Sequence, residues 1–201
     1  IDAKFPLHAA ARTGDVDAMT QLLDGGAEVD AKKGGATPLF VACEGGHVDA
    51  ARLLLERGAA FKDDGSAFCE GDTVEARYQG QKYYPGKISR DCGEGKYDIA
   101  YDDGDKEEGV DARLIRKQTL SPLYAACEKG HVDAARLLLE KGADADRATE
   151  DGRTPLRIAC QKGHVDAARL LLDNGAKVDR ANEGGGTPLF VACQEGHVDA
   201  A

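Results

Sequence analysis

Apolar and polar positions follow a helical period over most of the chain, and the pattern itself repeats. Residues 154–168 read TPLRIACQKGHVDAA and residues 187–201 read TPLFVACQEGHVDAA, an offset of 33. A further copy begins 33 residues earlier at Ser121, another begins at Thr37, and a more divergent one begins at Phe5. The offset from Thr37 to Ser121 is 84, so 51 additional residues lie between the second and third units.

Each unit predicts two short helices. A Ser or Thr cap precedes a proline at the first helical position, as in Thr154-Pro155, and a glycine such as Gly163 follows the first helix. The second helix carries an apolar stripe at helical spacing, for example Ala51, Leu54 and Leu55. Neither helix can bury its apolar side alone, so the pattern predicts a mostly α-helical solenoid in which stacked copies share one core.

The pattern T-P-L, then G-H-V, then L-L and G-A resembles ankyrin repeats over about three quarters of the chain. It gives four complete units plus the first half of a fifth. The resemblance implies that each helix pair is joined to the next by a finger-like hairpin. The chain begins at Ile1 rather than at a methionine and stops within a unit, so we expect it to be a piece of a longer protein.

The additional residues have a different period. Residues 71–117 contain short stretches in which apolar and aromatic residues alternate, around Val74, Tyr84, Ile99 and Val110, with glycine-rich turns between them. This pattern predicts four short strands. Tyr97, Ile99, Tyr101 and Asp103 fall on one face of the third strand, and Val110, Leu114 and Ile115 lie in or beside the last. About fifty residues suit a small SH3-like all-β barrel. We therefore expect ankyrin units one and two in residues 1–65, an inserted barrel in residues 66–120, and units three to five in residues 121–201, the last one truncated.

The insert resembles a Tudor domain. The resemblance rests on the V-x-A-x-Y start, on Y-P-G-K-I-x-R-D and on G-K-Y-D-I-x-Y-D-D-G-D. It implies an aromatic cage for methylated Lys or Arg, in which a ring face and a cation attract each other by up to ~2 kcal/mol. The residues carried over are Tyr78, Tyr84 and Tyr101 as walls and Asp103 as the carboxylate. Asp105 stands where a fourth aromatic residue often closes the cage, which favours lower methylation states or methyl-arginine.

Two alternatives to a working cage remain. The tyrosines at the strand ends could close the small core of the barrel, which would leave a plain ankyrin scaffold whose insert binds no methylated residue. The barrel could instead bind nucleic acid. Residues 69–117 hold 12 acidic and 9 basic residues, which argues against this second alternative, because nucleic-acid affinity depends mainly on clustered Lys and Arg.

The composition of the whole chain supports a partner-binding protein. Asp and Glu number 36 against 26 Lys and Arg, a net charge of −10, so nucleic acid is an unfavourable partner and a basic protein partner is expected. No apolar run approaches the ~18 residues of a membrane helix. The six cysteines include no C-x-x-C pair, so we expect free thiols, no zinc and a reducing intracellular compartment, with nucleus or cytoplasm undecided. Four of them recur at one position of successive units, where we expect small buried residues: Cys43, Cys127, Cys160 and Cys193.

No residue set predicts catalysis. Serine is scarce, and no nucleophile stands beside a candidate base. The histidines of the Gly-His pairs recur in successive units, which indicates hydrogen bonding at the corner of each repeat rather than catalysis or metal binding; they are His47, His131, His164 and His197. We expect no enzymatic activity, no cofactor and no metal.

Positions that differ between units are free to bind a partner, since the identical positions serve packing. The ankyrin resemblance places the variable positions on the concave face and the fingers, including residues 147–153 and 180–186. The candidate contact residues are Phe40, Tyr124, Arg157 and Phe190 after Pro-Leu, and Lys129 and Lys162 before the Gly-His pairs. An alternative is that Phe40 and Phe190 only pack against neighbouring units. We expect a monomer that binds one protein partner here and a methylated basic segment at the insert.

Overall fold

A computed structural model describes residues 5–33, 36–60, 73–77, 83–117, 121–149 and 151–200. Within these residues the chain forms two compact units, which are described separately. The helical unit takes in Ile1–Ala31, Thr37–Lys62 and Leu120–Ala201, and the sheet unit takes in Lys32–Ala36 and Asp63–Thr119. The predicted boundaries at 65/66 and 120/121 fall on or beside residues outside the described ranges and stay a prediction.

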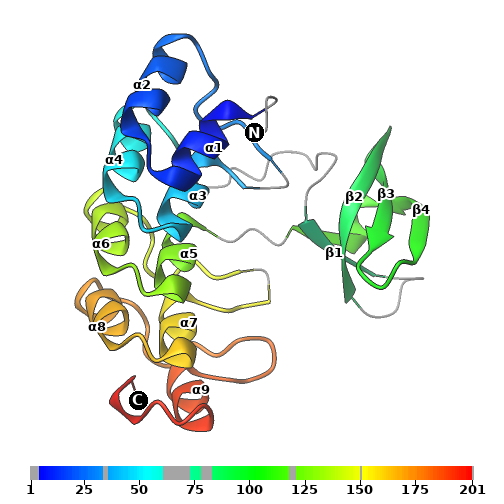
Figure 1. The fold of residues 1–201 in the computed structure, drawn as a ribbon. Coiled ribbons are helices and arrows are strands. Elements are labelled where there is room, and N and C mark those ends of the chain that lie inside the picture. Colours follow the sequence, from blue (N-terminus) through cyan, green and yellow to red (C-terminus); the bar gives the residue numbers. More distant parts are fainter. Residues whose placement is uncertain are drawn as a thin grey trace. The chain divides into compact units, whose positions relative to one another are not determined.

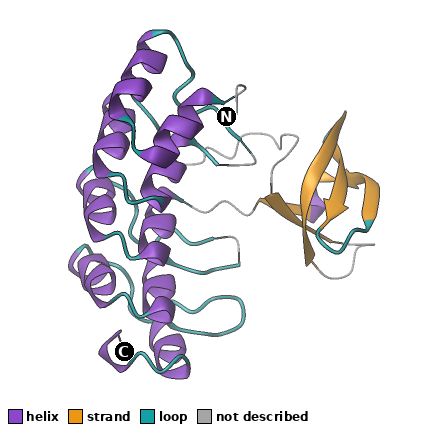
Figure 2. Cartoon of the chain, in the orientation of Figure 1, coloured by secondary structure: helices purple, strands orange, loops and turns teal. Residues whose placement is uncertain are grey.

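The helical unit consists of helix pairs stacked one on the next (Figures 1 and 2). The first helices of the pairs form one row and the second helices form another. The pairs are α1 (Pro6–Thr13) with α2 (Val16–Asp24), α3 (Pro38–Glu44) with α4 (Val48–Glu56), α5 (Pro122–Lys129) with α6 (Val132–Glu140), and α7 (Pro155–Lys162) with α8 (Val165–Asp173). The last first helix, α9 (Pro188–Gln194), is followed by the short 3-10 helix η3 (Val198–Ala200).

Local sequence fixes where these helices begin and end. Before α3, α5, α7 and α9, a Thr or Ser side chain accepts a hydrogen bond from the backbone N–H three residues on, and proline occupies the first helical position. Gly130 and Gly163 end α5 and α7 with φ of 74° and 72°, a left-handed conformation that costs glycine little. The start and stop signals expected from the sequence are therefore confirmed at these positions.

Recurring histidines join successive units. His47 Nε2 lies 2.9 Å from the carbonyl oxygen of Arg12 in the preceding unit, and His164 Nε2 lies 3.1 Å from that of Glu128. His131 Nε2 lies 3.1 Å from the carbonyl oxygen of Glu44, although the two residues are 87 apart in the chain. Helix α3 also contacts α5 directly. The second and third units therefore stack on each other in spite of the residues inserted between them, and the structural role expected for these histidines is confirmed.

The repeated cysteines divide into two groups. Cys43, Cys127 and Cys160 are buried and free, as expected, and burial raises the pKa of the first two thiols to about 12. Thiols with so high a pKa stay protonated at neutral pH and are poor nucleophiles. The expectation of burial is wrong for Cys193, which is exposed. Its helix α9 packs on α7, and only η3 follows it in the described residues.

The sheet unit is a five-stranded antiparallel sheet rather than the four strands expected. Its strands are β1 (Thr73–Arg77), β2 (Tyr83–Gly93), β3 (Lys96–Tyr101), β4 (Lys106–Asp111) and β5 (Ile115–Lys117), in the order β4-β3-β2-β1-β5. The 3-10 helix η2 (Ala112–Leu114) joins β4 to β5. Strands β4 and β5 form the two edges, and the described residues show no pairing between them, so the sheet is open and closure into an SH3-like barrel is not shown.

One face of the sheet carries the core. Opposite residues of paired strands point to the same side, and the pairs Ile88–Ile99 and Gly86–Tyr101 lie across β2 and β3. The buried cluster is Val74, Ala76, Ile88, Tyr97, Ile99, Tyr101, Val110 and Ile115. The alternation expected for β3, with Tyr97, Ile99 and Tyr101 on one face, is therefore confirmed.

Candidate protein-binding surfaces

The four candidate anchors of the repeats occupy one equivalent position in successive first helices. Each lies three residues after its cap, and the cap oxygen accepts its backbone N–H at 3.1–3.2 Å. The pairs are Phe40 with Thr37, Tyr124 with Ser121, Arg157 with Thr154, and Phe190 with Thr187. We call these four residues the anchor row.

The members of the anchor row differ in exposure. Phe190 is 59% exposed and Tyr124 only 2%, whereas Phe40 and Arg157 are half-buried. Helix α5 packs between α3 and α7, which accounts for the burial of Tyr124. This burial raises the pKa of the Tyr124 hydroxyl, and the positive charges of Arg153 and Arg157 oppose that rise. Both arginines therefore lie near one buried tyrosine of the preceding unit.

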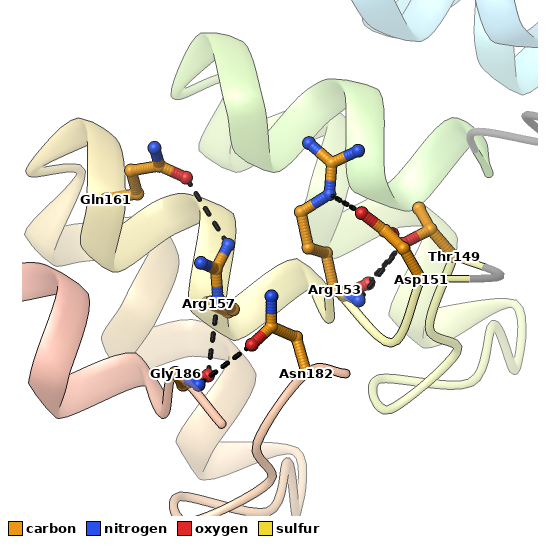
Figure 3. Close-up of polar contacts among 7 residues, drawn as sticks. All are labelled: Thr149, Asp151, Arg153, Arg157, Gln161, Asn182 and Gly186. Atoms are coloured by element: carbon orange, nitrogen blue, oxygen red, sulfur yellow. Dashed lines mark hydrogen bonds and ion pairs between the residues drawn. The ribbon is translucent and has the colours of Figure 1, made fainter. Parts of the chain in front are cut away.

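The finger between α6 and α7 is held by its own side chains (Figure 3). Thr149 donates its hydroxyl to Asp151, accepts the backbone N–H of Arg153 at 3.0 Å, and donates its own N–H to the Arg153 carbonyl at 2.9 Å. Arg153 Nε forms an ion pair with Asp151 Oδ2 at 2.6 Å. Burial raises the pKa of Asp151, but the Thr149 hydrogen bond and the Arg153 charge outweigh it and hold the pKa below its ordinary value.

The next finger, between α8 and α9, lies against the first. The backbone N–H of Glu183 donates to the carbonyl oxygen of Asp151 at 3.1 Å. Asn182 Oδ1 accepts the N–H of Gly186 at 2.8 Å, and the Gly186 carbonyl accepts Arg157 Nε at 3.4 Å. Figure 3 shows Arg153, Arg157 and Asn182 projecting from these two fingers and from α7. Backbone and side-chain hydrogen bonds therefore link the two fingers to each other and to α7.

Two lysines flank the same helices. Lys129 and Lys162 are the last residues of α5 and α7, and both are exposed. Neither forms an ion pair within the described residues. They add positive charge at the end of the first helices, beside the Gly-His corner of each unit.

The candidate cage residues of the sheet unit are Tyr78, Tyr84, Tyr101, Asp103 and Asp105. Tyr78 lies outside the described residues. Tyr84 is 41% exposed and lies two residues before Gly86, which pairs with Tyr101, so Tyr84 and Tyr101 point to the same side of the sheet. The N–H of Asp102 donates to the Pro85 carbonyl at 3.0 Å, but β3 ends at Tyr101 and Asp103 follows in the β3–β4 turn rather than on the face of the strand. Tyr84 and Tyr101 therefore share one side of the sheet, and Asp103 lies in the turn directly after Tyr101.

Tyr101 itself is only 5% exposed, and its hydroxyl donates to Glu107 at 2.8 Å. Its ring is part of the sheet core. Asp103 accepts the N–H of Asp105 at 3.1 Å within the β3–β4 turn, where both carboxylates are exposed. Tyr84 is thus the candidate ring with the largest accessible area among the described cage residues.

Comparison with protein-family models decides the class of the helical unit. The model for ankyrin repeats matches the chain in three copies, at residues 2–64, 105–182 and 148–201. The chain belongs to the ankyrin-repeat family. A comparison with curated proteins found no match. Residues 65–104, which hold β1 to β3, lie outside the ankyrin matches, and no finding identifies the sheet unit as a Tudor domain.

Ankyrin repeats are typically non-catalytic, and their presence indicates that this chain carries a scaffold for protein interaction. In the described part of the chain, no helix is long and apolar enough to cross a membrane. The same residues hold no group of three or more His, Cys, Asp or Glu side chains arranged to bind a metal ion.

The sequence predicted that the finger of residues 147–153 is variable, but it did not identify Arg153, Asp151 or Asn182 as candidate binding residues. Their importance comes from contacts between units: Asn182 and Arg157 meet at Gly186, 29 residues after Arg157. One signal was available, because Arg153 stands immediately before its cap, where the other units have lysine, alanine, leucine or glycine. That comparison marks Arg153 as variable but does not show that it lies near Arg157.

Proposed function

We propose that the chain is a non-catalytic adaptor with two binding surfaces. The ankyrin surface formed by the anchor row, Lys129, Lys162 and the fingers binds a protein partner. The Tudor-like insert binds a methylated Lys or Arg segment at the end of the sheet that carries Tyr84, Tyr101 and Asp103, together with Tyr78 and Asp105. On this proposal the insert is a domain of its own, a small barrel spanning residues 66–120.

The proposal for the sheet rests on one observation, the register that puts Tyr84 and Tyr101 on one side of the sheet, with the turn that holds Asp103 directly after Tyr101. An exposed ring attracts a methylated cation by its electron-rich face, and a carboxylate accepts a remaining N–H of a lower methylation state. The surrounding turn is acidic, with Asp102, Asp103 and Asp105 all exposed, which favours a basic segment.

An NMR titration of the full chain with 13C-labelled tyrosine rings tests this proposal. Peptides carrying unmethylated, mono-, di- and trimethylated Lys and dimethylated Arg are added in turn. We expect saturable shifts of the Tyr84 resonance with methylated peptides, strongest for the lower methylation states, and their loss in Tyr84→Ala. Asp91→Asn, an exposed acidic position on β2, serves as the control and should leave the titration unchanged. No shift at millimolar peptide would reject the cage.

A second candidate function is a plain ankyrin scaffold whose insert binds no methylated residue. It is favoured by Tyr101, whose ring is 5% exposed and whose hydroxyl is bonded to Glu107, so that it offers little ring surface to a ligand. The titration separates the two candidates, because the plain scaffold predicts no tyrosine shift with any methylated peptide.

A further inference from the structure

Arg157 is the charged member of the anchor row, and the described residues give it no carboxylate partner. Its Nε donates to the Gly186 carbonyl at 3.4 Å and its Nη1 to Gln161 Oε1 at 3.5 Å, both long contacts to neutral oxygens. A half-buried guanidinium loses hydration, and it has five N–H donors to satisfy. Phe40, Tyr124 and Phe190 occupy the same position in other units, so packing of the repeat does not require an arginine.

Further donors lie around Arg157 and also lack partners within the described residues. The two terminal nitrogens of Arg153 make no hydrogen bond there, since its contact with Asp151 uses Nε. The side-chain nitrogen of Asn182 is likewise unpaired there, while its oxygen is occupied by the Gly186 N–H. The oxygens of Asp151 are engaged by Thr149 and Arg153. The cluster therefore has spare donors and few spare acceptors.

These groups converge from two neighbouring units. The charges of Arg153 and Arg157 both act on the hydroxyl of Tyr124, which belongs to the preceding unit. The carboxylates of Asp151 and Glu128 act on the same hydroxyl with the opposite sign. Asp151 is already paired with Arg153, so of these two described carboxylates Glu128 is the one that would repel an incoming anion.

We propose that the donor cluster of Arg153, Arg157 and Asn182, which lies beside the buried Tyr124, binds an Asp or Glu carboxylate in an acidic segment of a protein partner. This inference rests on the proposed function of the ankyrin surface and names the chemistry of its partner. Arginine binds carboxylates with two parallel hydrogen bonds, and such contacts are roughly twice as strong as neutral ones. Lys129 and Lys162 add attraction at longer range. The net charge of −10 predicts a basic partner for the chain as a whole, but it does not describe this face.

The test uses the full chain and three capped heptapeptides of equal length: one rich in glutamate, one with glutamine and one with lysine at the same positions. Binding is followed by anisotropy of a labelled peptide and by the Nε–Hε resonances of arginine. We expect the glutamate peptide alone to bind and to shift the Arg153 and Arg157 resonances. Arg157→Gln should weaken binding by about tenfold, as for removal of one charge-assisted anchor.

Three further variants sharpen the test. Arg169→Gln removes the same charge from an exposed position on α8 in the same unit and should change affinity by less than about twofold. Arg157→Phe introduces the residue type of Phe40 and Phe190, so it preserves the repeat and should lose binding as Arg157→Gln does. Glu128→Gln removes the opposing carboxylate and should strengthen binding by about twofold.

The outcomes separate this inference from the function on which it rests. If Arg157→Gln and Arg169→Gln weaken binding equally, or if the glutamine peptide binds as well, the carboxylate site is rejected while the ankyrin surface remains a protein-binding surface. If a basic peptide alone shifts resonances of the anchor row, the partner chemistry is overturned in favour of a basic segment. If no peptide shifts any residue of the anchor row, both the site and the proposed role of that surface fail.

Discussion

At the residue scale, the carboxylate of Asp98 holds three strands of the sheet together. It forms an ion pair with Arg90 of β2 at 2.8 Å and accepts the N–H of Gly109 in β4 at 3.0 Å and the thiol of Cys92 at 3.0 Å. The hydrogen bonds from Cys92 and Gly109 lower the pKa of Asp98, burial opposes them, and the charge of Arg90 adds to the lowering. The ionised carboxylate is therefore the form that the folded sheet favours.

We expect the sheet to lose stability in acid through this residue. Because the pKa of Asp98 is lower in the folded chain than its ordinary value of 3.8, its contribution is complete above that pH and is lost as the pH falls through the folded value. The Gly109 amide resonance and near-UV circular dichroism of the tyrosines report the change. Asp98→Asn should be less stable at pH 7 and show a flatter profile below pH 4, whereas Asp102→Asn, at an exposed turn position, should keep the profile of the unmodified chain. An unchanged profile in Asp98→Asn would contradict the prediction.

Single residues also show that the sequence predicted which side of a strand a residue occupies but not whether it is buried. The alternation of Tyr97, Ile99 and Tyr101 placed them on one face, which the structure confirms. The pattern could not tell whether Tyr101 faces solvent or the core, because burial depends on which strands cover it, and β4 supplies Glu107 as the partner of its hydroxyl. Likewise, the identity of Arg157 was visible in the sequence, but the sequence could not show that Arg157 has no ion-pair partner among the described residues, because that depends on how the fingers stack.

At the element scale, the Gly-His corner explains why each unit must carry a glycine at this position. A Cβ added to Gly46 would lie 2.7 Å from His131 Nδ1, because the imidazole of the next unit lies against the glycine backbone. Gly46 also has φ of 71°, a conformation unfavourable for other residues. Two requirements, the backbone conformation and the space for the histidine, therefore act on the same residue.

Substitution of two glycines separates these requirements. Gly58 has φ of 89° but nothing within 4 Å of an added Cβ. Gly58→Ala should therefore cost only the backbone strain, about 1–2 kcal/mol, whereas Gly46→Ala should cost about 1–3 kcal/mol more from overpacking. Urea unfolding followed by far-UV circular dichroism measures both. The additional loss should disappear when Gly46→Ala is combined with His131→Ala; if it persists, the contact with His131 is not its cause.

The helical elements were far more predictable than the sheet. The first helices α3, α5, α7 and α9 each begin with a Thr or Ser cap and a proline, and the repeats show this pattern several times, as at Thr37, Thr154 and Thr187. The sheet has one copy, and its strands depend on partners distant in the chain. The short β5, which pairs Ala76 with Ile115, was expected only as an apolar segment beside the last strand, because three residues give no measurable alternation.

At the scale of the whole molecule, the inserted residues do not interrupt the stack. Helix α3 contacts α5, α4 contacts α6, and His131 reaches the carbonyl oxygen of Glu44 as its equivalents do in uninterrupted units. The energy of an ankyrin stack comes mainly from each unit and from its contacts with its neighbours. These contacts between the second and third units are made by the helices themselves, so the insert is dispensable for them.

Excision of the insert tests this independence. We expect a chain in which the segment between Gly58 and Ser121 is replaced by the finger that joins Gly142 to Thr154 to keep its helical circular dichroism and to unfold in urea at a midpoint near that of the full chain. It should also keep the binding of the glutamate peptide and lose every response to methylated peptides, because the donor cluster lies in the retained units and Tyr84 in the removed one.

A matched control inserts the same finger with His131→Ala, which should weaken the contact between the second and third units and separate the unfolding into two steps. Loss of helicity in the excised chain, with His131 intact, would show that the inserted residues are needed for the stack and that the two binding surfaces cannot be treated as separate modules.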